Sequence, residues 1–529
     1  MRVPAVMITQ NPDFASTYVP LSEEPDEAVM FLSPADEGGH GFDELMVDFE
    51  GKMTPCNQVV SIVSRLAEKG VLQSTRVKVT PRMPAGNAAG LRRTSILHSI
   101  IEANYIAHQY FGSNIVEEAV YPVVNGDVRS LVRLETNFNI IKNYIVENEN
   151  MQRTVDVEDL RLIPLLDELN LMLNAAAIAS SYISAHEIMH SQGEIEKLRI
   201  YLSRELISTK FGMVSSVLTI RLALSKLREI SESSSIPVYP ILEFSSLPLR
   251  GNIGHGQKDL ILKTYSGIST VALSPSVVYD SEGKRTPNLV KLLKEELHGK
   301  RNLPEFSEEE ETQIKEMTAV FAHEYIKTIS KASKVLEKLA PLVPDRREAV
   351  VNKAVEVASK ELECLKFGAK ASTPEPFSIP PPVKYTALMY TLGVPPELIG
   401  VGRAINILEK KMKNAIEHLL DFYPSLETDI SSSWRCLCLD AARKVFPEQF
   451  ISDIAEDVKF IKDFLSPEEE CSLPHRAITM MFSEYAALKS MHEGSLRNSE
   501  LKEFVRDGGV EEVARQLILH GGRIRRALG

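Results

Sequence analysis

The sequence predicts an α/β fold, a (β/α)₈ TIM-type barrel followed by a large C-terminal all-helical extension. Two observations lead to this prediction. In the first half of the chain, short apolar runs alternate with longer segments of helical period, as in parallel βα units whose strands are covered on both faces. From Ser307 onward the period is helical. We therefore expect the barrel, with the site, in residues 1–300 and a helical region that packs on it in residues 301–529.

The expected strands are short runs rich in Val, Ile and Leu. In chain order they are Val3–Ile8, Leu45–Phe49, Arg76–Val79, Ala119–Val124, Leu160–Leu166, Leu198–Leu202, Val238–Phe244 and Ser269–Leu273. The clearest helical segments between them are Arg93–Gln109, Thr136–Val146, Met172–Met189 and Met213–Glu229. An eight-fold βα alternation predicts a closed barrel, in which the chemistry lies on the loops after the carboxyl ends of the strands.

The second half of the chain contains one clear helix start. Ser307 with Glu310 has the spacing of a capping box and predicts a helix that continues through Ser333. Arg346–Leu365 is expected to be helical too, without an intervening strand. Residues 372–382 are rich in proline, which predicts an ordered loop or lid between helices.

Composition excludes several classes of protein. Of the 529 residues, 44% are hydrophobic and 25% are charged, and no apolar run approaches the ~18 residues of a membrane span. The first residues do not resemble a signal peptide, so we expect a cytoplasmic protein that has no membrane partner. A net charge of −12 argues against nucleic-acid binding. The five cysteines lack C-x-x-C pairs and are expected to be reduced thiols.

Polar side chains follow six of the expected strands. They include Asp48, Glu50 and Lys52 after the second strand, Arg82 after the third, Asp167 after the fifth, Arg204 and Glu205 after the sixth, and Ser246, Arg250 and Gly251 after the seventh. Taken singly, each cluster is better explained by helix caps and turns. Together they favour a site for Mg²⁺ and a phosphorylated acid, because carboxylates bind the ion and arginine binds phosphate or carboxylate in a planar fork. Lys52, Arg204, Ser246 and Gly251 are the expected substrate-binding residues.

Several motifs occur in a characteristic order along the chain. They are MITQNPD at 7–13, DFEGK at 48–52, TPR at 80–82, LPLRG at 247–251, GVPPELIG at 393–400 and RRALG at 525–529. From residue 1 to 529 the chain thereby resembles the archaeal-type phosphoenolpyruvate carboxylases. The resemblance implies a homotetrameric barrel enzyme that joins phosphoenolpyruvate to bicarbonate, giving oxaloacetate and phosphate. It also implies that the enzyme uses Mg²⁺ or Mn²⁺ and no biotin.

The resemblance assigns roles to three retained positions. Arg82 and Arg250 would hold the charge of the substrate or of carboxyphosphate during catalysis. Asp167 stands where the family has a metal-binding Glu, and the exchange keeps an oxygen ligand on a side chain one methylene shorter. These residues predict that anion and metal binding are kept.

Other positions depart from the family pattern. Asn11 replaces the catalytic His, which removes the side chain whose pKa suits proton transfer near neutrality. Leu206 stands at a metal-binding Asp, so that the neighbouring Glu205 is the expected ligand. Pro381 replaces an Arg, and Lys370 is expected to supply charge near the site.

Three functions stay open on these grounds. The first is a phosphoenolpyruvate carboxylase that accommodates the replacements, and the overall resemblance favours this enzyme. The second is a divergent relative that binds a phosphorylated or dicarboxylic anion, with altered or lost catalysis. The third is a zinc peptidase, because His186 and His190 form an H-E-x-x-H motif; its place on an outer helix without a third ligand puts it last.

Overall fold

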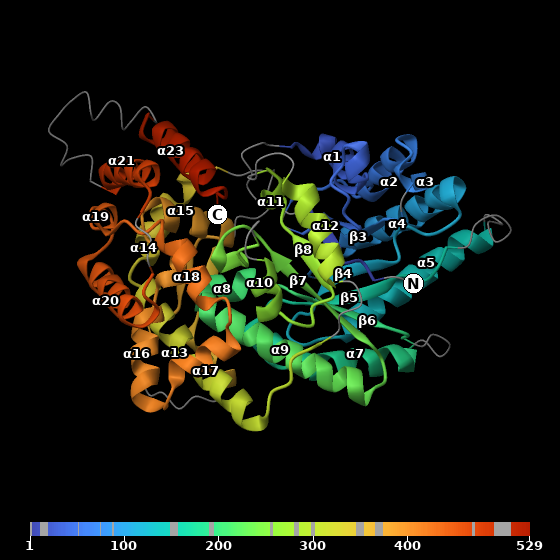
Figure 1. Cartoon of the computed structure of the whole chain (residues 1–529). Helices are drawn as coiled ribbons and strands as arrows, with labels where there is room; N and C mark the ends of the chain where they lie inside the picture. Colours follow the sequence, from blue (N-terminus) through green and yellow to red (C-terminus); the bar gives the residue numbers. More distant parts are fainter. Residues whose placement is uncertain are drawn as a thin grey trace.

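The computed structural model consists of a closed parallel barrel with a group of helices on one side of it (Figure 1). The structure describes residues 3–10, 19–50, 52–74, 76–86, 89–148, 157–189, 195–253, 258–279, 285–297, 302–344, 354–365, 374–467, 471–490 and 509–528. Among these residues, no helix is long and apolar enough to cross a membrane.

The barrel has eight strands in the order of the sequence, and β1 pairs with β8 to close it. The strands are β1 (Val6–Thr9), β2 (Glu44–Asp48), β3 (Lys78–Arg82), β4 (Glu118–Pro122), β5 (Arg161–Leu166), β6 (Leu198–Leu202), β7 (Val238–Phe244) and β8 (Thr270–Leu273). Each coincides with an expected strand to within a few residues. The predicted (β/α)₈ barrel is confirmed.

Helices surround the barrel because the connections between successive parallel strands are helical, and α11 and α12 follow the last strand. They are α1 (Glu24–Leu32), α2 (Gln58–Glu68), α3 (Val71–Ser74), α4 (Gly90–Phe111), α5 (Arg129–Asn148), α6 (Leu169–Leu173), α7 (Ala175–Met189), α8 (Glu205–Phe211), α9 (Met213–Ser233), α10 (Lys258–Thr264), α11 (Ser276–Tyr279) and α12 (Arg285–Leu297). Short 3₁₀ helices lie at η1 (Leu21–Glu23), η2 (Ala35–Glu37) and η5 (Pro248–Arg250).

The interior of the barrel is filled by layers of side chains. The middle layer is mainly apolar and consists of Met7, Met46, Val120, Ile163, Leu165, Tyr201, Ile241 and Ala272. Because side chains alternate along a strand, residues two positions further on point into the barrel at the carboxyl ends of the strands. Asp48, Pro122, Ser203 and Glu243 occupy such positions. The apolar layer therefore separates the polar end of the barrel, where the carboxyl ends of the strands lie, from the opposite end, which we call the lower end.

A buried ion network closes the lower end. Arg199 of β6 donates to both oxygens of Glu44, at 2.9 and 2.7 Å, and to Glu118 at 2.8 Å. Thr80 donates to the same Glu44 carboxylate at 2.5 Å. All four side chains are buried. Their partners satisfy charges that would be costly to bury alone, so this end acts as a structural plug.

The second half of the chain is largely helical, as expected. Its helices are α13 (Glu308–Ile329), α14 (Ser333–Leu339), α15 (Pro382–Thr391), α16 (Val401–Lys411), α17 (Ala415–Phe422), α18 (Leu426–Trp434), α19 (Leu439–Ala442), α20 (Glu448–Leu465), α21 (Leu473–Ser490) and α23 (Gly509–Arg525), with 3₁₀ turns η6 (Ala340–Leu342), η7 (Ser359–Leu365) and η8 (Pro396–Leu398). The predicted capping box between Ser307 and Glu310 is present. Helix α13 packs on α9 of the barrel.

One predicted helix is wrong where the structure describes it. Within Arg346–Leu365, residues 354–365 form strand β9 (Val355–Val357) and the turn η7. Strand β9 pairs antiparallel with β10 (Phe377–Ile379), which lies inside the proline-rich stretch. Strands of three residues are too short for alternation to be distinguished from helical period.

The last described residues pack against the barrel's seventh loop. Ala527 is fully buried and forms a small cluster with Leu247 and Tyr390. The guanidinium of Arg525 lies over the Tyr390 ring, 5.4 Å from its centroid. The carboxyl-terminal end of α23 is therefore close to the loop that follows β7.

Candidate active site

An arginine lies among the polar strand ends. Arg82 is the last residue of β3 and pairs with Asp48 of β2 in the strand register. Its Nε atom is buried without a hydrogen-bond partner among the described residues. Burial lowers the pKa of Arg82, but Asp48, then Glu243 and further carboxylates, more than offset this and raise it. A buried guanidinium edge without a partner is suited to bind an anion.

Asp48 supplies a buried carboxylate beside that arginine. Its Oδ1 accepts the backbone N–H of Glu50 at 2.9 Å, whereas its Oδ2 is buried without a partner in the described part of the chain. Burial raises the pKa of Asp48, and the positive charges of Arg82 and Lys52 only partly oppose the rise. This oxygen can therefore accept from a ligand or bind a cation.

Asp167 follows β5 and faces the same arginine. Burial raises the pKa of Asp167, while Arg82 and then Lys210 of α8 lower it through their charge. The neighbouring Glu168 also has a raised pKa, through burial and then through Asp167. Asp48 and Asp167 thus approach Arg82 from two strands, and the structure brings these three sequence-predicted positions together.

Glu243 was missed in the sequence analysis. It is buried in β7, two residues beyond Ile241 of the interior layer, and accepts a hydrogen bond from Ser203 Oγ at 3.3 Å. Its charge raises the pKa of Arg82. The signal was a lone acidic residue on the inward face of an apolar strand, which is costly unless it has a partner or a function.

Arg250 and Glu205 form a separate pair. Arg250 ends the turn η5, is buried, and donates a charge-assisted hydrogen bond from Nη2 to Glu205, the first residue of α8. The structure therefore places the expected metal ligand Glu205 against Arg250, and the following Leu206 has no ligating atom. A carboxylate that already neutralises an arginine is a weaker ligand for a cation, because the two positive charges compete for it.

The expected substrate-binding residues lie in different surroundings. Lys52 is fully buried, and its Nζ donates to Glu24 at 2.7 Å and to the carbonyl of Gln10 at 2.6 Å. Arg204 lies over the rings of Phe244 and Tyr265, 4.9 and 4.5 Å from their centroids. These contacts direct Lys52 and Arg204 to the protein interior.

Of the remaining predicted site residues, the structure describes two and does not describe the other two. Ser246 is half-buried, and Gly251 has φ +113° directly after Arg250. Asn11 and Lys370 lie outside the described residues, so their predicted roles stay predictions.

The conformation of Gly251 gives a testable expectation. A Cβ atom at Gly251 would lie 2.6 Å from Cδ1 of Phe244, whereas one at Gly38, φ +89°, would meet nothing within 4 Å. Gly38→Ala should therefore cost only the strain of positive φ, roughly 1–2 kcal/mol, and Gly251→Ala should cost more. Urea denaturation of both variants measures the difference; equal losses would contradict the close approach.

Asp48 and Asp167 provide the kind of ligand atom that a divalent cation needs, although they do not form a complete metal site. No group of three or more His, Cys, Asp or Glu side chains within the described ranges converges in a metal-binding arrangement. Mg²⁺, however, is held by only one or two carboxylates, with waters and substrate oxygens as its other ligands. Asp48, with its partnerless buried oxygen, and Asp167 supply hard oxygen donors of this kind.

Comparison with known proteins assigns the family. The family model of phosphoenolpyruvate carboxylase matches residues 3–529. The chain belongs to this family. Curated phosphoenolpyruvate carboxylases of Methanosarcina mazei and Methanosarcina acetivorans are 29% and 28% identical to it, over 99% of both chains in each case. That of Methanopyrus kandleri is 25% identical over 100% of this chain and 99% of its own.

His186 and Glu187 of the H-E-x-x-H motif lie on α7 of this family member, near the amino end of β5 and not at the carboxyl ends of the strands. His186 of α7 is fully buried; its Nδ1 lies 3.0 Å from Glu135 and its Nε2 2.8 Å from Arg161. Both ring nitrogens are therefore engaged inside the protein. His190 lies outside the described residues. The described contacts favour a structural His186 over the zinc ligand considered from the sequence.

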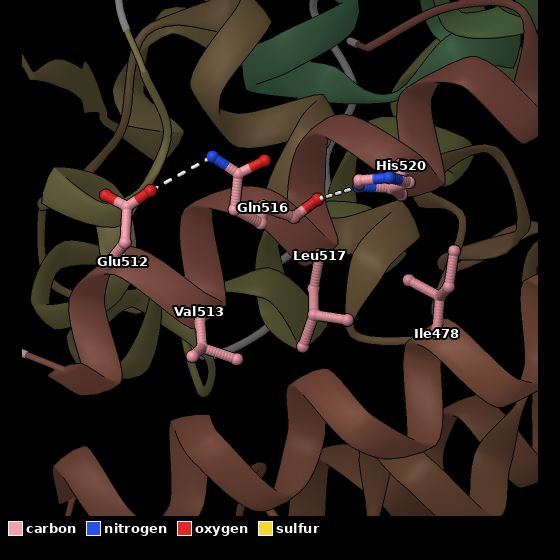
Figure 2. Close-up of a pocket in the computed structure, with 6 residues that line it drawn as sticks. All are labelled: Ile478, Glu512, Val513, Gln516, Leu517 and His520. Atoms are coloured by element: carbon pink, nitrogen blue, oxygen red, sulfur yellow. Dashed lines mark hydrogen bonds between the residues drawn. The ribbon is translucent and has the colours of Figure 1, made fainter.

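An apolar groove occurs elsewhere on the molecule. Ile478 of α21 and five residues of α23 enclose a space of about 370 Å³ (Figure 2). The polar side chains at its edge bond locally: Gln516 donates to Glu512 at 3.0 Å, and His520 Nδ1 lies 2.8 Å from the carbonyl of Gln516. This groove lacks the convergent charges found around Arg82.

Proposed function

We propose that this protein carboxylates phosphoenolpyruvate with bicarbonate to give oxaloacetate and phosphate. The observation that supports it most is the family match from residue 3 to 529 together with a charged Arg82 at the carboxyl end of the barrel. Phosphate and carboxylate groups of the substrate suit the guanidinium groups of Arg82 and Arg250. The reaction needs both groups held in fixed geometry while charge moves from one to the other.

The proposal includes a divalent cation and an assembly. Mg²⁺ or Mn²⁺ would be held by Asp167 and Asp48, and would neutralise charge developing on the substrate oxygens. Glu205 would have to leave Arg250 before it could bind the ion. By family resemblance we also propose a cytoplasmic homotetramer that uses no biotin, with residues 1–300 as the barrel unit and 301–529 as the helical unit.

A divergent relative with altered chemistry is the second candidate. Two observations favour it: Glu205 is paired with Arg250, and the neighbouring Leu206 cannot bind a metal. Such a protein would bind a phosphorylated or dicarboxylic anion at the same strand ends without forming oxaloacetate.

Oxaloacetate formation tests the proposed function. The protein is supplied with phosphoenolpyruvate, bicarbonate and Mg²⁺ or Mn²⁺, and NADH oxidation by added malate dehydrogenase reports the product. We expect activity in the native chain, its loss in Arg250→Ala, and an increase in Asn11→His because an imidazole restores proton transfer. If the native chain and an Asn11→His, Leu206→Asp variant both form none, while phosphoenolpyruvate still raises the melting temperature, the second candidate is correct.

A further inference from the structure

The loop that carries Arg250 is a tight reversal. Within it, Arg250 N–H donates to the carbonyl of Leu247 at 2.9 Å, and Ser245 N–H donates to the carbonyl of Arg250 at 2.7 Å. The two residues after Arg250 both have positive φ, Gly251 at +113° and Asn252 at +55°. Such a conformation is strained for Asn252 and persists only when surrounding groups fix it.

One buried carboxylate of the helical extension contacts the loop just before Arg250. Glu397, in the turn η8, accepts the backbone N–H of Leu249 at 2.8 Å. The same oxygen accepts the hydroxyl of Tyr390 at 2.9 Å. Glu397 is completely buried. The backbone of Leu249 is thereby bound to a side chain that lies 148 residues later in the chain.

A second buried carboxylate contacts the loop just after Arg250. Asp429 of α18 accepts a hydrogen bond from the Nδ2 atom of Asn252 at 2.5 Å. Its other oxygen accepts the hydroxyls of Tyr423, at 2.7 Å, and Ser425, at 3.0 Å. These contacts fix the Asp429 carboxylate, which in turn holds the side chain of the strained Asn252.

The two carboxylates are costly to bury. Burial raises the pKa of Glu397 to about 7 and that of Asp429 to about 6. Apolar side chains of similar volume would pack against helices at lower cost. Both carboxylates nevertheless bind the loop, one on each side of Arg250.

We propose that Glu397 and Asp429 are positioning residues, which set the conformation of the Arg250 loop from the helical extension. The kinetic part of this proposal rests on the proposed function, whereas the structural part does not. The hydrogen bonds to Leu249 and Asn252 determine where the guanidinium of Arg250 lies relative to the barrel. A displacement of about 1 Å at such a group can cost ~10²-fold in rate.

Glu135 provides a matched control for Glu397. It is also a buried Glu, and it accepts a backbone N–H, from Leu162 at 2.9 Å, and a tyrosine hydroxyl, from Tyr182 at 2.5 Å. It lies on α5 and contacts Leu162 at the amino end of β5, away from the carboxyl ends of the strands that form the site. Glu135→Ala should therefore lower stability without moving the Arg250 loop.

The first test measures the loop directly. Native protein and the variants Glu397→Ala, Glu397→Gln and Glu135→Ala are treated briefly with trypsin, and cleavage of the Arg250–Gly251 bond is quantified by mass spectrometry. We expect at least ~10-fold faster cleavage in Glu397→Ala than in the other three, because glutamine keeps the acceptor oxygen. Equal cleavage of this bond in Glu397→Ala and Glu135→Ala would overturn the proposal.

Asn252→Gly tests the second contact, and serves if Glu397→Ala does not fold. Glycine removes the hydrogen bond to Asp429 while relieving the positive-φ strain. Faster cleavage after Arg250 without loss of melting temperature supports positioning, and unchanged cleavage contradicts it.

The second test uses turnover. We expect kcat/KM for oxaloacetate formation to fall ~10²-fold in Glu397→Ala, to stay within about threefold of the native value in Glu397→Gln, and to be unchanged in Glu135→Ala. If the native chain forms no oxaloacetate, the proposed function fails while the tryptic test still decides the positioning role. A Glu397→Gln variant as impaired as Glu397→Ala would contradict positioning by an acceptor oxygen.

Discussion

Arg82→Ala is expected to lower kcat/KM for oxaloacetate formation by ~10²–10³-fold, the effect of removing one preorganised donor from a developing charge. The negative charges of Asp48, Glu243 and Asp167 stabilise the charged form of Arg82 and raise its pKa. Its loss removes an anion-binding fork and the positive charge that interacts with each of these carboxylates. Arg82→Lys should recover only part of the activity, because an ammonium lacks the planar fork.

The pH profile gives an independent check on Arg82. Its charge lowers the pKa of Asp48 and of Asp167, which burial has raised. Without Arg82 both pKa values rise further, so the acidic limb of the activity profile should move to higher pH in Arg82→Ala. Arg129→Ala, an exposed change on α5, serves as the control and should leave both rate and profile unchanged. An Arg82→Ala enzyme with native activity would show that the anion binds elsewhere.

Arg199→Ala is expected to destabilise the protein by about 3–5 kcal/mol, because it removes the cation that pairs with both buried carboxylates, Glu44 and Glu118. Urea denaturation followed by circular dichroism measures the loss. Arg65→Ala removes an exposed ion pair with Asp26 and Glu68 and should change stability far less. A loss in Arg199→Ala no larger than in Arg65→Ala would contradict a structural plug at the lower end.

The same ion network predicts how the stability difference between the native protein and Arg199→Ala depends on pH. Burial raises the pKa of Glu118, but Arg199 and then Lys78 outweigh it, and the pKa is lowered overall from its ordinary 4.5. A carboxyl group whose pKa is lower in the folded than in the unfolded protein stabilises the fold fully at any pH above its pKa in the unfolded protein. This contribution is lost as pH falls through the pKa of the folded protein. The stability difference between native protein and Arg199→Ala should therefore narrow below about pH 4.5.

The barrel could be predicted from the sequence because its strands are continuous apolar runs at regular intervals. The helix predicted across Arg346–Leu365 is wrong at β9. This strand of three residues pairs with β10, also of three residues, and neither is long enough to show a strand pattern in the sequence. Local period carries no information about such a contact between distant segments.

The site was predicted less completely for a similar reason. Arg82 and Asp167 could be selected because strand ends meet at one rim of a barrel. The pairing of Glu205 with Arg250, and of Lys52 with Glu24, depends on side-chain directions that spacing does not determine. Glu243 was not among the predicted site residues because it lies within β7, whereas the chemistry of a barrel is expected on the loops after the strands.

The packing of Ala527 against Leu247 has a consequence for how the protein is made. During synthesis the Arg250 loop leaves the ribosome well before Glu397, Asp429 and Ala527, which surround it in the finished structure. A nascent barrel thus emerges with that loop unsupported. The site can therefore assemble only after the segments that contain Glu397, Asp429 and Ala527 have been made, and not when the eight strands of the barrel have closed.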